Sequence, residues 1–516
     1  MALLRAITTV GGYTLGSRVL GFIRDVLTAA ILGAGAVADA FFISQKIPNL
    51  FRHLFAEGAF NAAFVPQFAG LAETKGHEAA RTFAEQAMAV LIAVLLPIIV
   101  IGEIAMPILM IAFAPGFVDE PERFGLAVVM TRITFPYLLF ISLVSLMGGV
   151  LNSLGRFAAA AATPMLLNVC MIGAILWLVP YTPTPGHALA WGVAISGVIQ
   201  FVWLLAECGR AGMTLRLPRP RLTPEVKLML KRVVPGAIGA GVYQVNVYID
   251  MVIASALPLG SISYLYYADR ITQLPLGVVG VAAGTALLPM LTRTLRAGNA
   301  DGAMAQQNRA LEFSLLLTLP AAAALMVIAR PIVEVLFVRG AFDAQAADAT
   351  ADALAIYSIG LPAFVLVKGL TPGFFAREDT TTPVKIAIAA LFINLAVALT
   401  LMFPFRHLGI AAATAASSWF NTAALTIILY GRGHFRIDAR LARRAPRTLI
   451  ASIGMAAALW FARAALAPWM ASGTFNGLIG LSVLIAGGAA IFGLLAVALG
   501  AIDRSDLSRI NPRRRA

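Results

Sequence analysis

The feature that most constrains this chain is a series of apolar runs, each about 20 residues long and bounded by charged residues, Pro or Gly. Hydrophobic residues make up 60% of the 516 residues and charged residues only 12%. An average soluble domain carries about twice that charged share. A soluble core could not bury so much apolar surface, so the excess must face lipid. The sequence therefore predicts an all-α integral membrane protein.

Fourteen transmembrane helices are predicted from these runs. Their approximate limits are 8–34, 38–72, 84–112, 125–154, 159–180, 187–210, 227–257, 262–296, 307–337, 348–376, 383–403, 409–431, 448–468 and 476–500. The first two runs are interrupted by charges, so a plot of hydropathy alone is expected to miss or split them.

Basic residues set the predicted orientation, because Lys and Arg are retained in cytoplasmic loops. Two loops on one side hold most of the clustered charge, namely Arg216, Arg219, Arg221, Lys227, Lys231 and Arg232 in one and Arg436, Arg440, Arg443, Arg444 and Arg447 in the other. Both termini are therefore predicted to be cytoplasmic. The net charge of +14 is interpreted as a topology signal and a contact with anionic membrane lipids, and nucleic-acid binding is not expected.

An internal repeat relates the two halves of the chain. Aligning residues 25–48 with 250–275 pairs Asp25 with Asp250 and Pro48 with Pro275. Spans 1–6 thus resemble spans 7–12, and because six is even the two halves share one orientation. Parallel repeats around a midplane cavity are typical of transporters. Chance similarity between apolar helices is the alternative.

Four domains follow from this repeat. They are an N-terminal six-helix lobe at 1–215, a C-terminal six-helix lobe at 222–436, two further helices at 446–502 and a basic cytoplasmic tail at 503–516.

Several charged residues fall inside the predicted spans, where each costs several kcal/mol unless it faces a wet cavity or a partner. They belong mainly to spans 1, 2 and 8. The charged residues are Arg18, Arg24, Asp25, Asp39, Lys46, Arg52, Glu57, Asp269 and Arg270, and the polar Ser17 lies next to Arg18. Counted inward from the outer ends of their spans, Arg24 and Arg270 lie at matching depths. Arg18 and Arg52 lie about one and a half turns nearer the cytoplasm.

The arginines outnumber the nearby acids at these depths, and an arginine fork suits phosphate and carboxylate. We therefore expect Arg18, Arg24, Arg52 and Arg270 to converge on a central cavity that binds an anion. The alternative is that these charges form interhelical salt bridges that fix packing, above all at Asp25, Asp39, Asp269 and Lys46.

With these residues assembled, the sequence resembles the MurJ (MviN) lipid II flippases of the MOP exporter superfamily. The resemblance is carried by GSRVLGFIRD at 16–25, ADAFFISQKIPNLFRHLFAEGAFNAAFVPQF at 38–68, LNSLGRF at 151–157, YYADRITQLPLGV at 266–278 and FFAREDTTTPVK at 374–385. It implies that the chain moves lipid II, an undecaprenyl-diphosphate-linked muropeptide, to the outer leaflet of the bacterial cytoplasmic membrane by alternating access.

The same resemblance implies roles for individual residues. Arg24, Arg52 and Arg270 match arginines that bind the diphosphate and head group, whereas Ser17, Arg18, Asp39 and Glu57 match positions of cargo handling and gating. Spans 13 and 14 would form the groove for the lipid tail. A sodium site at Asp250, Asn394 and Thr414 is left open, because Ala398 stands where a second acid is expected.

Other functions are less well supported by the residues. The five histidines are scattered and no phosphate-binding loop is present, so neither an enzyme nor a bound cofactor is expected. A cation-coupled multidrug or polysaccharide-lipid exporter of the same superfamily is the alternative function, although an arginine-rich cavity suits a cationic cargo poorly. We expect a monomer, and contacts with the cell-wall synthesis machinery are left open.

Overall fold

The computed structural model describes the backbone of residues 2–55 and 59–503. Within these ranges, the side chains at 2–8, 51, 53–55, 59, 61–62, 234–243, 246 and 278–286 are not described. The described chain is helical almost throughout, and its isolated β-bridge joins Arg339 to Phe342. This confirms the predicted all-α fold class.

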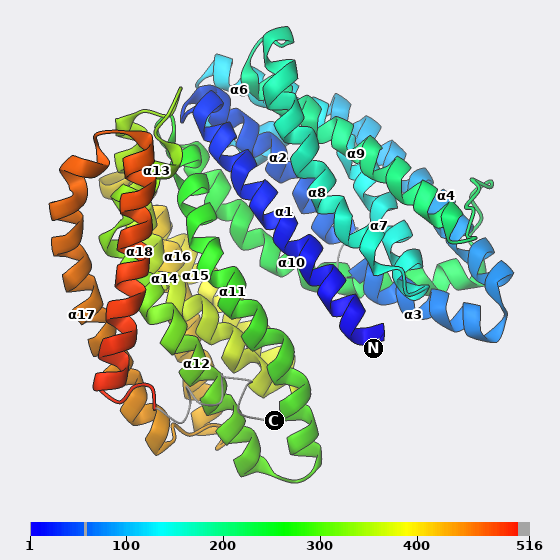
Figure 1. The fold of residues 1–516 in the computed structure, drawn as a ribbon. Coiled ribbons are helices and arrows are strands. Elements are labelled where there is room, and N and C mark those ends of the chain that lie inside the picture. The colour runs from blue at the N-terminus through cyan, green and yellow to red at the C-terminus, as the bar shows by residue number, and fades with distance from the viewer. Residues whose placement is uncertain (1, 56–58, 504–516) are drawn as a thin grey trace. The chain divides into compact units, whose positions relative to one another are not determined.

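The helices follow the predicted runs closely (Figure 1). The first nine are α1 (Ala2–Leu32), α2 (Ala36–Phe55), α3 (Ala59–Thr74), α4 (His77–Ile104), α5 (Met106–Phe113), α6 (Pro121–Thr134), α7 (Tyr137–Ser153), α8 (Phe157–Gly173) and α9 (Pro185–Arg210). The others are α10 (Pro224–Ser255), α11 (Ser261–Arg296), α12 (Ala300–Val327), α13 (Ala329–Phe337), α14 (Ala344–Phe375), α15 (Thr381–Phe405), α16 (His407–Gly431), α17 (Ala439–Met470) and α18 (Thr474–Ala498).

Ten helical segments of the described chain are long and apolar enough to cross a membrane. They correspond to ten of the fourteen predicted spans. The other four predicted spans are also helical and correspond to α1, to α2 with α3, to α10 and to α11. These four carry the charged residues of the candidate site, and each of them includes residues whose side chains are not described. The count of fourteen and the cytoplasmic termini stay predictions.

The chain divides into two compact units, which differ in extent from the predicted repeat halves. Unit 1 comprises residues 1–263 together with Arg339–Phe342, and unit 2 comprises Tyr264–Val338 and 343–516. The predicted lobes rest on sequence similarity rather than on contacts, so their boundaries stay a prediction.

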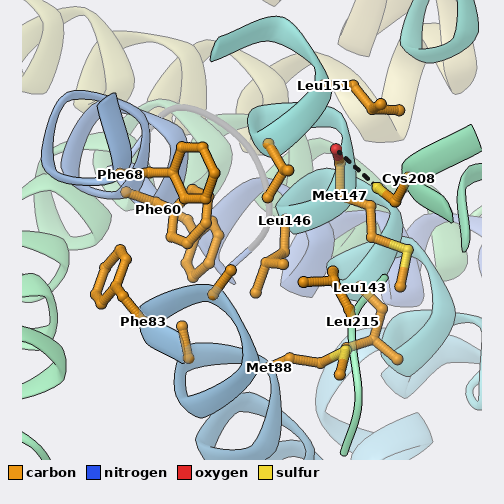
Figure 2. Packing of buried hydrophobic residues seen from close by; sticks show 14 of the residues in the cluster. Phe60, Phe68, Phe83, Met88, Leu143, Leu146, Met147, Leu151, Cys208 and Leu215 are labelled. Atoms are coloured by element: carbon orange, nitrogen blue, oxygen red, sulfur yellow. Dashed lines mark hydrogen bonds between the residues drawn. The ribbon is translucent and has the colours of Figure 1, made fainter. Parts of the chain in front are cut away.

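Within unit 1, α1 packs on α8, α2 on α6, and α7 on α9. A core of aromatic side chains joins α3 to α4, with Phe64 stacked on Phe60, Phe68 and Phe83 at ring-centre distances of 5.4–5.7 Å. Figure 2 shows how Met88 and residues of α7, such as Leu146 and Met147, extend this core toward Cys208. This packing fixes the helices that position the site residues of unit 1.

Within unit 2, α14 packs against α12 and α16, and α17 packs against α12 and α18. The N-terminal half of α12 and the N-terminal end of α17 are joined by ion pairs that centre on Glu312. This carboxylate accepts from Arg440 at 3.0 Å and from the buried Arg444 at 2.5 Å, and Arg444 also pairs with Asp503. The last two predicted spans are therefore fastened to the rest of unit 2 by charge as well as by apolar contact.

The motif at 374–385 forms the turn between α14 and α15. The Arg377 guanidinium donates to the carbonyl oxygens of Gly373 and His434, at 2.7 and 3.3 Å. Asp379 accepts from the Thr382 backbone and from Arg432. Hydrogen bonds from Thr382 and Arg432 hold the pKa of the Asp379 carboxyl well below its usual range. This part of the family resemblance is thus explained by a structural turn.

Candidate functional site

Arg24 is buried on α1 and bonded on three sides. Its guanidinium pairs with Asp25 at 2.7 Å and donates to Asn168 Oδ1 on α8 at 2.9 Å and to Met171 Sδ at 3.8 Å. The Asn168 amide in turn donates to the Ser17 carbonyl oxygen at 3.0 Å. The Arg24–Asp25 ion pair lies within α1, whereas the hydrogen bonds between Arg24, Asn168 and Ser17 tie α1 to α8.

Asp39 is fully buried at the start of α2 and serves packing in this structure. It pairs with Arg123 of α6 at 2.7 Å. It also accepts from the backbone N–H groups of Gly260 and Ser263, at 2.8 and 2.9 Å, and from the Ser263 hydroxyl at 2.6 Å. One carboxylate thus holds together α2, α6 and the first turn of α11.

Arg123 lies just before the predicted span 125–154, yet its side chain is only 1% exposed. Its guanidinium carbon lies 3.9 Å from the centre of the Phe117 ring, in addition to the pair with Asp39. Arg123 lies within the first turn of α6, which begins at Pro121, a few residues before the predicted span. The signal available in the sequence was that a membrane-embedded Asp39 requires a partner.

Arg52 lies on the last turn of α2 and lines a cavity of about 220 Å³ within unit 1. The other walls come from α7, α8 and α9. Polar side chains from these helices share the lining with apolar ones. Nearby on α2, the Lys46 carbonyl oxygen accepts from the Tyr248 hydroxyl at 2.8 Å. An arginine in a cavity that other polar side chains also line fits the predicted anion site better than a packing role alone.

Arg270 lies on α11 in unit 2 and contacts Tyr266 one turn earlier. Its guanidinium donates to the Tyr266 hydroxyl at 3.1 Å, and its central carbon lies 5.0 Å from the Tyr266 ring centre. The adjacent Asp269 accepts from Gln273 at 2.5 Å. Because Arg270 belongs to unit 2 and Arg24 and Arg52 to unit 1, their convergence on one cavity stays a prediction.

The remaining predicted residues are placed as follows. Arg18 is exposed on α1, whereas Ser17 is half-buried and contacts Asn168. Glu57 lies outside the described residues. The sequence did not single out Asn168 or Gln200, because a lone amide in an apolar run resembles many others until its neighbours on other helices are known.

The candidate cation ligands lie on three helices. Asp250 is half-buried on α10 in unit 1, whereas Asn394 on α15 and Thr414 on α16 belong to unit 2. The Thr414 hydroxyl donates to the Ile410 carbonyl oxygen at 3.0 Å. Among the side chains that the structure describes, no three of His, Cys, Asp or Glu gather as around a metal ion. The sodium site, which relies on amide and hydroxyl oxygens as well, stays a prediction.

Comparison with protein families and relatives gives one consistent result. The model of the family Lipid II flippase MurJ matches residues 28–479. A probable lipid II flippase MurJ from Rhizobium tropici is 44% identical, with 99% of this chain and 98% of that protein aligned. A probable lipid II flippase MurJ from Rhizobium meliloti (strain 1021) is 48% identical over 90% of this chain and 87% of that protein.

Solved structures show the same fold. A lipid II flippase MurJ in an inward closed conformation matches with a TM-score of 0.78 at 24% identity, covering 94% of this chain and 97% of that chain. An inward-facing multidrug resistance transporter of the MATE family, within the MOP superfamily, matches with a TM-score of 0.64 at 14% identity over 81% and 94% of the two chains. From the family match and the two rhizobial relatives it follows that this chain belongs to the MurJ family of lipid II flippases.

Proposed function

We propose that this chain, a multi-pass protein of the bacterial cytoplasmic membrane, moves lipid II from the inner to the outer leaflet. The observation that carries the proposal is the family match, which extends over 28–479 and therefore includes most of the arginine-bearing helices. Lipid II carries a diphosphate between its polyprenyl tail and its sugar–peptide head. Such a head group cannot cross about 30 Å of hydrocarbon without a polar route.

The arginines supply the chemistry that such a route requires. Arg52 lines a cavity with both polar and apolar walls in unit 1, and Arg270 lies beside Tyr266 in unit 2. A guanidinium keeps its charge when it leaves water and bonds phosphate oxygens in pairs. In this proposal the two halves rock about the repeat axis and present the arginines first to the cytoplasm and then to the outside.

The lipid tail is proposed to lie along α17 and α18. These helices keep large apolar side chains exposed, including Trp460, Phe461 and Leu494. Transport in this proposal breaks no covalent bond and requires no prosthetic group, so the chain is not an enzyme. It acts as a monomer among membrane lipids, without nucleic acid.

The sodium site at Asp250, Asn394 and Thr414 is a separate part of the proposal. If sodium binds there, lipid II transport by purified protein in vesicles should rise with sodium concentration, and Asp250→Ala should remove that dependence. Equal rates in sodium and choline buffers would reject the site without affecting lipid II as cargo.

The function is tested by depleting the protein in cells and measuring which leaflet holds lipid II. Accumulation in the inner leaflet, reversed by the wild-type chain, is expected. An unchanged distribution together with lost resistance to cationic drugs would instead support the multidrug exporter.

A further inference from the structure

The cavity beside Arg52 contains open space that is not needed for the helices to pack closely. Two adjacent glycines of α7 border it. A methyl group added at Gly149 would come within 3.1 Å of Phe64, so Gly149 is needed for close packing with α3. A methyl group added at Gly148 would meet only Ala160, at an ordinary 3.5 Å. Gly148 therefore leaves open space in a cavity of about 220 Å³.

A buried amide oxygen borders the same space. Gln200 of α9 is 1% exposed, and its Nε2 donates to the Thr163 carbonyl oxygen of α8 at 3.1 Å. Because the Thr163 carbonyl can only accept a hydrogen bond, the atom of the Gln200 amide that faces it must be Nε2. The other atom, Oε1, is therefore an acceptor. Among the residues that the structure describes, nothing donates to that oxygen. The Thr163 hydroxyl is engaged elsewhere, because it donates to the Ala160 carbonyl oxygen at 2.8 Å.

The rest of the lining defines what kind of group fits. Val144, Leu167 and Leu204 form apolar walls, and Arg52 adds a permanent positive charge. A ligand part that matches must present an N–H or O–H donor to Gln200, an apolar group to the walls, and an anion close by. A free phosphate lacks the apolar group and, when fully ionised, the donor.

Size gives an independent constraint. Pockets that enclose whole small-molecule ligands usually measure about 300–1,000 Å³. A cavity of about 220 Å³ is smaller, so it suits one portion of a larger molecule. An acetamido sugar joined to a diphosphate combines an amide N–H, a methyl group and a neighbouring anion in one such portion.

We infer that this cavity is a sugar subsite of the transport route. The acetamido group of the head group enters it, Gln200 Oε1 accepts the amide N–H, the methyl group contacts Val144 and Leu204, and Arg52 contacts the adjoining diphosphate. The inference rests on the proposed function, because the sugar belongs to lipid II.

The test compares two lipids that share tail and diphosphate but differ in sugar. Binding of lipid II and of undecaprenyl diphosphate to the purified full-length protein is measured for wild type, Gln200→Leu and Gly148→Leu. The first variant removes the acceptor with little change in volume, and the second fills the cavity. Each should raise the dissociation constant for lipid II about five- to tenfold, which is the change expected from losing about one hydrogen bond. Binding of undecaprenyl diphosphate should stay unchanged.

Three further variants make the result specific. Ser196→Ala alters a buried residue one turn away on α9 whose hydroxyl donates to Val193, and it should bind both lipids like wild type. Arg52→Ala should weaken both lipids. Gly148→Ala, which adds only a methyl group, gives a milder cavity-filling change if the leucine variant does not fold.

Two outcomes would overturn the subsite: equal weakening of both lipids by Gln200→Leu, or lipid II binding unchanged in both Gln200→Leu and Gly148→Leu. If the wild-type protein still moves lipid II between leaflets in either case, the proposed function stands and only the subsite is rejected. A wild-type protein that does not move lipid II rejects the proposed function, and the subsite with it.

Discussion

Arg24 and Arg52 show two different environments for an arginine in a helix that is predicted to span the membrane. Arg24 is closed in by Asp25, Asn168 and Met171, whereas Arg52 borders a cavity. Removing one partner of a buried ion pair leaves an uncompensated charge, which costs about 3–5 kcal/mol in measured cases. The two residues should therefore differ in what their loss does to the folded protein.

We predict that Arg24→Ala lowers both the amount of folded protein and its melting temperature, whereas Arg52→Ala abolishes transport with a near-normal melting temperature. Both are measured on purified protein and by complementation of a depleted strain. The double variant Arg24→Leu with Asp25→Leu should regain stability, because it removes both charges. Equal stability of Arg24→Ala and wild type would show that the Arg24–Asp25 pair contributes nothing to folding.

Residues such as Asn168 and Arg123 mark the limit of prediction from the sequence. Charges inside apolar runs are visible in the sequence because they break hydropathy, so Arg24, Asp39 and Arg52 were singled out. Their partners lie many residues away, as Asn168 does from Arg24, and sequence distance gives no measure of that contact. The structure therefore adds the pairings, and with them the uncharged residues Asn168 and Gln200.

At the scale of elements, helix positions were predicted well and interruptions within them were not. The run at 84–112 is divided into α4 and α5 near Ala105, and the run at 307–337 into α12 and α13 at Ile328. Each break has a charged residue and a proline beside it, Glu103 and Pro107 at the first and Arg330 and Pro331 at the second, but the apolar residues on both sides make each run read as one span. A proline alone does not identify a break, because Pro97 and Pro320 lie inside continuous helices.

The attachment of α17 to α12 gives a prediction with a matched control. Arg444 is buried and pairs with Glu312, whereas its neighbour Arg443 is exposed. Arg444→Ala should lower the melting temperature by several degrees, since it leaves the largely buried Glu312 with fewer partners. Arg443→Ala should be nearly silent in the same thermal unfolding assay. The reverse order of effects would show that surface charge matters more than this network.

Asp39 connects three elements, so its effect should depend on its partner. Asp39→Ala alone and Arg123→Ala alone should each destabilise the protein by several kcal/mol, because each leaves a buried charge. The double variant should cost less than the sum of the two. This is measured as a double-mutant cycle of unfolding free energies in detergent. Additive effects would mean that the 2.7 Å pair carries no coupling.

At the scale of the whole molecule, the proposed cargo carries negative charge through the membrane field. Moving one charge across 100 mV is worth about 2.3 kcal/mol. We predict that outward flipping of lipid II in vesicles is faster when the side corresponding to the cytoplasm is negative, and that collapsing the potential slows it severalfold. The control is a vesicle with equal ion gradients but a clamped zero potential. A rate independent of potential would show that cargo charge does not cross the field in the slowest step.

The bonds around Asp39 have a consequence for how the protein is made. Asp39 precedes its partner Arg123 by 84 residues in the chain. It precedes Gly260 by 221 residues and Ser263 by 224, so the ribosome adds all three partners after it. During that interval α2 carries a carboxylate without its final donors, and a lone carboxylate is disfavoured in hydrocarbon. Nascent α2 should therefore leave the insertion channel late, once α6 has emerged with Arg123. Because of this order of synthesis, the Asp39–Arg123 pair should form early in membrane insertion. The bonds from Gly260 and Ser263 should form later, when the start of α11 has been made.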